Sequence, residues 1–185
     1  MFAAVAGCGV SQEEGRKLPS HYDDSLTDDR AVLEVALCDF AAWKGPTFGE
    51  LEGVLALDPL SAEPIYRTLS DTRQIIEPIS DLVSDELILA FLERNAVRSD
   101  ATSLVSGTPW ARIYTAGEES RLNGILLDGA KALGSISMPG FNAGRSRALV
   151  QFNHSWSIHR AVVTFALSKQ DGTWKIQGRY QTVFL

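Results

Sequence analysis

From Ile136 onward the chain alternates apolar and polar residues with a period of two, the pattern of strands that bury one face. Three successive runs keep their apolar residues on one parity: Ala148, Val150 and Phe152; Ala161, Val163, Phe165 and Leu167; and Trp174, Ile176, Tyr180 and Phe184. The dipeptide Asp171-Gly172 between the last two runs is a strong hairpin signal. The pattern predicts a C-terminal antiparallel β-meander of about four or five strands.

The residues between these apolar positions are mostly polar and are predicted to form a solvent-exposed face of the sheet. They include Gln151, Lys175, Gln177 and Arg179. A basic polar sheet face is also found in single-stranded nucleic-acid binders, but those faces carry exposed aromatic side chains for base stacking. Here the aromatic residues lie on the buried parity, so we expect a solvated face and no nucleic acid partner.

Two other segments repeat apolar residues at helical spacing. The first, residues 28–43, is preceded by Ser25 at the spacing of a capping box and is followed by the helix breakers Gly45-Pro46. The second, residues 84–95, has Ser84 as its predicted cap. Together with the meander, these segments predict an α+β fold in which the sheet packs against two amphipathic helices.

The remaining segments give weaker signals. Residues 47–83 have no clear period, apart from an apolar run at 53–57 that predicts a short strand ended by Asp58-Pro59. Residues 9–27 are polar and rich in turn-forming residues, which predicts a flexible tether. The rest of the chain, residues 28–185, is then the single domain that a length of 185 residues leads us to expect.

The first eight residues are small and apolar and end in Cys8. The tetrapeptide Val5-Ala6-Gly7-Cys8 resembles a bacterial lipobox, in which small residues admit the signal peptidase and the cysteine thiol receives a lipid. The resemblance implies a partial signal and lipobox segment at 1–8, and a membrane surface as partner through lipidated Cys8. The alternative is the frayed N-terminus of a cytoplasmic protein, because no basic residue precedes Cys8 as in a secretory signal.

Charge is distributed unevenly along the chain. The net charge is −6, which argues against general affinity for nucleic acid. Residues 1–95 carry 18 acidic and 7 basic side chains, whereas residues 96–185 carry 5 acidic and 10 basic ones. We expect ion pairs between an acidic helical half and a basic sheet half, with a basic partner-facing surface as the alternative. Cys38 lies among apolar residues of the first predicted helix, which predicts a small buried side chain and not a nucleophile.

The sequence contains no motif for a phosphate-binding loop, a metalloprotease or a serine nucleophile elbow. We therefore predict no catalytic residue, no metal site and no cofactor. The one suggestive group surrounds a predicted turn at 155–158: His154 and His159 would face each other across a hairpin, with Trp156 at its tip and Arg160 beside them. These four residues are the candidate surface for a ligand or partner. The alternative is that they simply flank an exposed hairpin.

Short motifs in the C-terminal half resemble those of a protein family. Gly140-Phe141-Asn142, Ala148-Leu149-Val150 and the run Asp171-Gly172-Thr173-Trp174 match the "GFN…ALV…dGxW" pattern of a group of uncharacterised bacterial secreted proteins and lipoproteins. The segment 86–95 is similar to one that is common upstream in the same group. The resemblance implies a curled antiparallel sheet and a secreted location, but it brings no activity with it.

These observations favour a lipid-anchored extracytoplasmic domain of a bacterial cell envelope that binds a small ligand or a protein. Two alternatives come from other classes of protein. One is a small secreted hydrolase with a histidine-containing site on the sheet, which a histidine beside a carboxylate in a cleft would favour. The other is a cytoplasmic interaction module whose N-terminus only mimics a lipobox.

Overall fold

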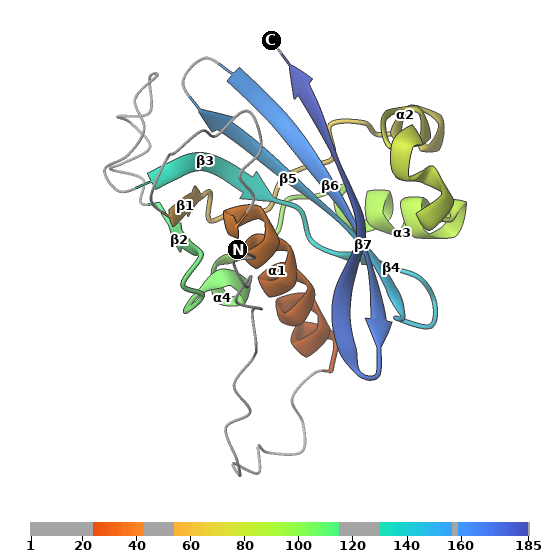
Figure 1. Ribbon diagram of the computed structural model, residues 1–185, viewed down its shortest axis with the longest axis horizontal. Helices are drawn as coiled ribbons and strands as arrows, with labels where there is room; N and C mark the ends of the chain where they lie inside the picture. The colour runs from red at the N-terminus through yellow and green to blue at the C-terminus, as the bar shows by residue number, and fades with distance from the viewer. Residues whose placement is uncertain (1–23, 43–53, 115–129, 157–158, 185) are drawn as a thin grey trace, which may run out of the picture.

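The computed structural model describes residues 24–42, 54–114, 130–156 and 159–184. These residues form an α+β fold with one mixed seven-stranded sheet and five helices, which confirms the predicted class. In Figure 1, the first helix lies on one side of the long C-terminal strands, and the second and third helices lie together on the other side.

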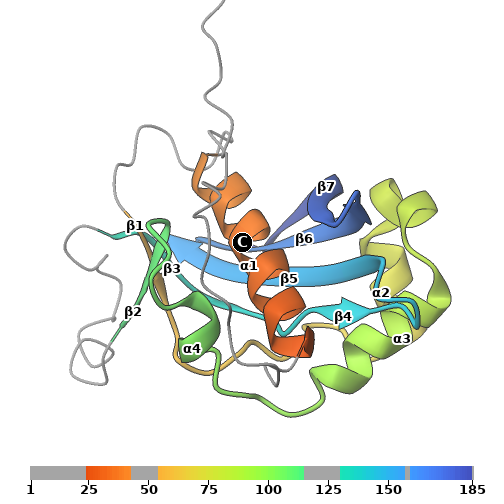
Figure 2. The same ribbon diagram turned by 90° about the horizontal axis from the view of Figure 1, so that it is seen from below.

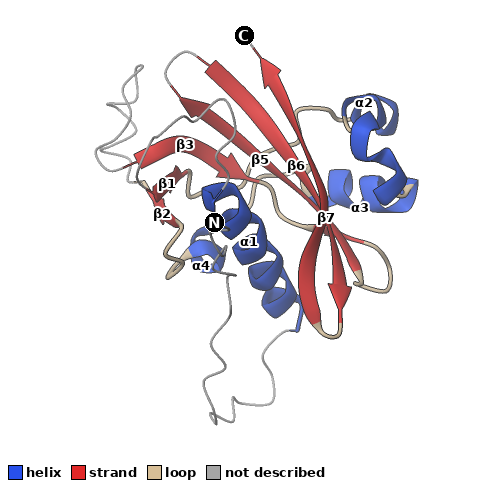
Figure 3. Cartoon of the chain, in the orientation of Figure 1, coloured by secondary structure: helices blue, strands red, loops and turns tan. Residues whose placement is uncertain are grey.

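The long strands form the predicted meander, which Figure 3 shows as a curved fan. The strand order is β2 (Ala111–Ile113), β1 (Val54–Leu57), β3 (Ala130–Ile136), β5 (Arg147–Trp156), β6 (His159–Gln170) and β7 (Thr173–Phe184), with the short β4 (Gly140–Phe141) beside β5. Neighbours from β3 to β7 are antiparallel. However, β1 pairs in parallel with both β2 and β3, so the sheet is not purely antiparallel. Parallel pairing is possible here because long crossovers, not hairpins, connect β1 to its two neighbours.

Both predicted helices are present. Helix α1 (Asp24–Ala42) begins before the predicted start at residue 28, so Ser25 lies inside the helix and is not its N-cap. Helix α3 (Asp85–Arg94) begins where predicted, and the hydroxyl of Ser84 accepts a hydrogen bond from the backbone N–H of Leu87 at 3.3 Å. Strand β1 confirms the short strand predicted at 53–57.

Three further helices lie in segments that the sequence left unassigned: α2 (Leu69–Ile75), the 3₁₀ helix η1 (Glu77–Leu82) and α4 (Thr102–Val105). Each is short, so the apolar period that identifies a helix is hardly repeated within it. Figure 2 shows α2 and α3 grouped at one end of the sheet.

Side chains of α1 and α4 share one apolar cluster with the sheet, and we call the side of the sheet that carries this cluster the inner face. Of the four aromatic residues predicted to be core, Phe152, Phe165 and Trp174 are buried there, with exposed fractions of 1%, 0% and 4%. The fourth, Tyr180, is only partly buried and packs with a different cluster. On the opposite side, the outer face, η1 and α3 form a second apolar cluster with Leu149 and Ala166. The sheet therefore buries apolar residues on both faces.

A β-bulge changes the faces predicted for β7. The register passes from Leu167 opposite Ile176 to Ala166 opposite Gly178, so Gln177 is an extra residue in β7. One extra residue moves all later side chains to the other face. Tyr180 accordingly packs with the outer cluster, and Arg179 forms an ion pair with Asp39 of α1 on the inner face.

A second correction to the predicted faces concerns β5. Gln151, which was expected to face water, is only 2% exposed on the outer face. Its side-chain amide donates a hydrogen bond to the hydroxyl of Thr164 on β6 at 3.3 Å, and Thr164 is itself 2% exposed. The alternation of apolar and polar residues therefore does not distinguish the two faces at this point, because both faces are covered.

The expected ion pairs between the acidic and basic halves are present. The carboxylate of Asp28 accepts hydrogen bonds from Lys169 at 2.7 Å, from the indole N–H of Trp174 at 3.1 Å and from Arg145 at 3.3 Å. Burial acts to raise the pKa of Asp28, but these three donors outweigh it, so that the pKa is lowered. Asp29, by contrast, is fully buried against Arg94, and burial raises its pKa.

The structure describes one of the two cysteines, Cys38. Cys38 is buried in α1, with 7% exposed, as predicted, and it is disulfide-bonded. Cys8, the predicted lipobox segment 1–8 and most of the predicted tether 9–27 lie outside the described residues.

Candidate ligand-binding groove

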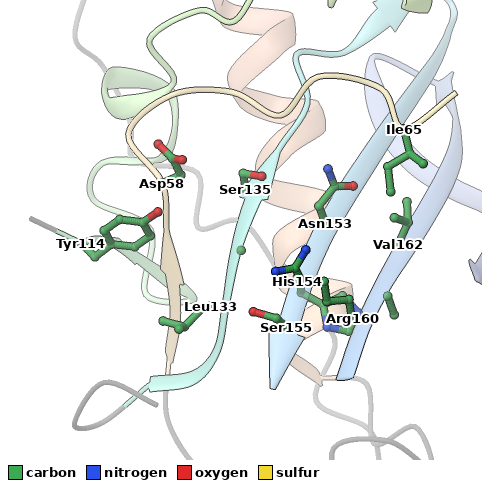
Figure 4. A pocket seen from close by; sticks show the side chains of 12 residues that line it. Asp58, Ile65, Tyr114, Leu133, Ser135, Asn153, His154, Ser155, Arg160 and Val162 are labelled. Carbon is green, nitrogen blue, oxygen red and sulfur yellow. The ribbon is translucent and has the colours of Figure 1, made fainter. Parts of the chain in front are cut away.

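The outer face of the sheet is hollowed beyond the end that η1 and α3 cover. A cavity of about 690 Å³ lies there over β3, β5 and β6, and we call it the outer groove (Figure 4). Its lining combines polar and apolar side chains from five segments of the chain: Asp58, Ile65, Tyr114, Leu133, Gly134, Ser135, Asn153, His154, Ser155, Arg160, Ala161 and Val162. The volume lies within the range of pockets that hold small organic molecules, about 300–1,000 Å³.

The register of the strands sets the floor of the groove. Asn153 of β5 lies opposite Ser135 of β3 on one side and Val162 of β6 on the other. Paired residues in a sheet point to the same face, so these three side chains share the outer face. The next pair on this face, Ser155 and Arg160, continues the floor toward the β5–β6 connection.

The segment that follows β1 forms one rim. The backbone N–H of Asp58 donates to the carbonyl of Gly134 at 2.8 Å, and that of Ala62 donates to Ile136 at 2.9 Å, so the chain follows the edge of β3 after β1 ends. Figure 4 shows the same segment passing above the groove to Ile65 on the opposite side. Tyr114 extends the rim, because its N–H is bound to the carbonyl of Leu57 at 3.0 Å.

Arg98 fixes this rim through hydrogen bonds to two of its residues. Its guanidinium binds the carboxylate of Asp58 at 2.6 Å and the carbonyl of Ser61 at 2.8 Å. Ser61 and Ser99 exchange two further hydrogen bonds, from the N–H of Ser61 to the Ser99 carbonyl at 2.7 Å and from the N–H of Ser99 to the Ser61 hydroxyl at 2.8 Å. The carboxylate at the rim is therefore held in place and neutralised by a partner outside the groove.

Arg160 and the side-chain oxygen of Asn153 both lie in the groove without a partner among the described residues. Arg160 is exposed, and its guanidinium has no ion-pair partner among the residues that the structure describes. The side-chain oxygen of Asn153 is buried and accepts no hydrogen bond within the same residues. A buried acceptor without a donor is costly, at about 1–3 kcal/mol, so the site is suited to a molecule that supplies one.

His154 is placed differently from the prediction. Its backbone lies opposite Ala161, whereas His159 lies opposite Trp156, so the two histidines are not cross-strand partners. Strand β5 continues to Trp156 and β6 begins at His159, so strand pairing extends into the segment 155–158 that was predicted to be a turn, and the pairing changes. The side chains of Trp156 and His159 lie outside what the structure describes, and of the four predicted residues His154 and Arg160 line the groove.

The His154 ring packs against the aromatic core. It is 3% exposed and makes an edge contact with Phe40 of α1, with ring centroids 4.8 Å apart. Burial lowers its pKa to about 3, so the imidazole is neutral at physiological pH. So weak a base is poorly suited to remove a proton near neutral pH.

The same pKa predicts an acid-dependent loss of stability. Below about pH 6.5 the unfolded chain binds a proton at His154 that the folded chain does not, so stability falls as the pH drops from about 6.5 toward 3. This one group contributes a slope on the order of 1 kcal/mol per pH unit. Urea unfolding of the wild type and of His154→Gln between pH 4 and 7 should show the smaller slope in the variant. Parallel curves would mean that His154 is not the buried neutral group described here.

Metal sites and membrane-spanning helices are two further features to consider in the described residues. No three His, Cys, Asp or Glu side chains among them lie close enough together to hold a metal ion. No helix within the described ranges is both long and apolar enough to cross a membrane.

Sequence reasoning missed most of the groove. The sequence pattern marks Asp58 only as the end of a strand, and it does not distinguish Ser135, Tyr114 or Ile65 from other residues. The sequence does contain one sign of a polar site on this face. Asn153 and Ser155 flank His154, and polar residues at alternate positions of a strand share a face. The remaining lining residues come together only through the parallel pairing of β1, which the sequence does not reveal.

No protein-family model, curated protein or solved structure matches the chain.

Proposed function

We propose that this chain is an extracytoplasmic binding domain, anchored to a bacterial membrane by a lipid on Cys8, and that it holds a small ligand in the outer groove. The observation that carries the binding role is the 690 Å³ cavity over an otherwise well-covered sheet. Sites for small molecules are typically concave and apolar, with a few convergent polar groups. The outer groove has this composition.

Binding fits the groove better than catalysis. The hydroxyls of Ser135 and Ser155 are possible nucleophiles, but a hydroxyl needs an adjacent base. His154 is neutral, with a pKa of about 3, and its ring contacts Phe40. The carboxylate of Asp58 is engaged by Arg98 and by the backbone N–H of Leu60 at 2.8 Å. A hydrolase based on His154 would require a more basic imidazole.

Two features support a location outside the cytoplasm, and only the first of them supports the lipid anchor. The residues before Cys8 resemble a lipobox, and Cys38 is disulfide-bonded. Disulfides persist in oxidising compartments such as the bacterial periplasm and the cell surface. Since the sequence has two cysteines, a lipid on Cys8 and a disulfide between Cys8 and Cys38 exclude each other in one chain, and experiment must separate them.

Metabolic labelling with a palmitate analogue tests the anchor. We expect wild type and Cys38→Ser, the matched control, to be labelled in a bacterial host and Cys8→Ser to remain unlabelled. Label that survives Cys8→Ser, or an unlabelled wild type, would overturn the anchor. A wild-type chain in which mass spectrometry finds Cys8 joined to Cys38 would overturn the anchor but leave export intact.

A blocked-groove variant tests the binding role. Ser135→Trp places a large side chain on the groove floor, whereas Ser103→Trp adds the same side chain at an exposed position of α4. We expect small molecules found by ligand-observed NMR against the wild type to bind Ser103→Trp equally and to lose at least about tenfold in affinity for Ser135→Trp. Equal binding by both folded variants would place the ligands elsewhere and overturn the proposal.

A further inference from the structure

The charged side chain of the outer groove that lacks an ion-pair partner among the described residues is a cation, Arg160. Arg160 extends into the groove from β6, beside Ser155, and forms no ion pair within the described part of the chain. Asp58 lies at the opposite rim, as Figure 4 shows, and its charge is offset by Arg98 at 2.6 Å. A guanidinium presents parallel N–H donors that match the two oxygens of a carboxylate. The groove is therefore suited to a ligand with one carboxylate.

A hydrogen-bond acceptor lies in the same floor. The buried Oδ1 atom of Asn153 has no donor among the described residues. The hydroxyls of Ser135, directly opposite, and Ser155, two residues along the strand, lie on the same face and can donate or accept. A ligand with several hydroxyl groups would satisfy this set, because each hydroxyl both donates and accepts.

The remaining lining limits the shape and charge of the ligand. Leu133, Ile65 and Val162 supply apolar surface for the C–H faces of a ring. Within the described lining, Arg160 is the one cation without an ion pair, and Asp58 lies across the groove. This balance disfavours polyphosphates and other strongly charged anions. The volume of about 690 Å³ admits one or two sugar rings.

We infer that the ligand is a hydroxylated carboxylic acid of the sugar-acid class. Its carboxylate binds Arg160, and a hydroxyl donates a hydrogen bond to Oδ1 of Asn153. This inference rests on the proposed binding role of the outer groove and specifies its ligand.

Protein-observed NMR titrations of the 185-residue chain with glucuronate, glucose and acetate test the assignment. Glucuronate and glucose differ at C6, where one has a carboxylate and the other a hydroxymethyl group, and acetate carries the carboxylate without the hydroxyls. We expect glucuronate to bind at least about tenfold more tightly than either, and more weakly as salt is added. Arg160→Gln should abolish the preference over glucose, and Asn153→Ala should weaken binding of both sugars. Lys175→Gln, which removes an exposed cation of β7, should change neither.

Each other result has a definite meaning. Equal binding of glucose would overturn the role of Arg160, and equal binding of acetate would overturn recognition of the hydroxyls. A third result is that no sugar acid binds, but other molecules bind the wild type and lose affinity for Ser135→Trp. In that case the ligand class is wrong and the binding role stands. If no molecule of any class occupies the groove, the proposed function itself fails.

Discussion

Trp174→Ala is expected to lower the free energy of unfolding by about 3–5 kcal/mol. The side chain is 4% exposed, and its ring lies 5.6 Å from that of Phe141 between centroids. The substitution also removes the indole N–H that binds Asp28 at 3.1 Å, which leaves a partly buried carboxylate with one donor fewer. Both the lost apolar contacts and the lost hydrogen bond act in the same direction.

Urea unfolding followed by circular dichroism measures this effect. The matched control is Lys175→Ala, the next residue of β7, whose exposed side chain should contribute less than about 0.5 kcal/mol. A conservative variant, Trp174→Phe, should retain most of the packing and lose the hydrogen bond to Asp28, at about 1–3 kcal/mol. Equal effects of the two alanine substitutions would show that the faces of β7 before the bulge are assigned wrongly.

Gly140→Ala is expected to cost about 3 kcal/mol. Gly140 lies in β4, where the sheet approaches α3 so closely that a Cβ atom would lie 2.6 Å from the backbone nitrogen of Phe91. The neighbour is helix backbone, which cannot move aside as a flexible side chain can, so the strand must separate from the helix.

Gly144→Ala is the control for this substitution, because the nearest atom to its Cβ would be the Ser146 hydroxyl oxygen at 3.9 Å. The two alanine variants have the same composition and lie in the same β4–β5 region. Chemical unfolding should separate them by at least about 2 kcal/mol. Near-identical midpoints and slopes would mean that β4 and α3 are not packed as tightly as described.

The meander could be predicted from the sequence because its signals are local. Apolar alternation identified the strands, and Asp171 and Gly172 form the predicted tight turn, with positive φ angles of 51° and 78°. Such angles suit the two central residues of a type I′ turn. Phe152 and Phe165 were assigned to the core on the same basis, and both are buried.

The errors have specific structural causes. In β7, the parity rule fails after Gln177, because the bulge moves Arg179 and Tyr180 to new faces. Gly178 was the available signal, since a glycine inside a strand often marks a bulge or a close approach. At this glycine a Cβ atom would lie 2.5 Å from a methyl carbon of Leu82. Gln151 is buried although the alternation predicts exposure, because polar side chains on this face, such as Thr164, are buried as well.

The groove was hardest to predict because it depends on pairings between segments far apart in the sequence. Asp58, Tyr114 and Asn153 meet only because β1 lies in parallel between β2 and β3. No local period encodes that arrangement. The prediction around the β5–β6 hairpin was partly useful, since Arg160 lines the groove, but its emphasis on paired histidines was wrong.

The outer groove, on the uncovered part of the outer sheet face, is the proposed ligand site of this protein. The most direct measurement is amide chemical-shift mapping on the ¹⁵N-labelled chain with any small molecule that binds it. We expect the largest shifts at Ser135, Asn153 and Val162, and little change in residues of α1 on the inner face. Shifts concentrated on α1, or spread evenly over the molecule, would contradict this placement of the ligand site.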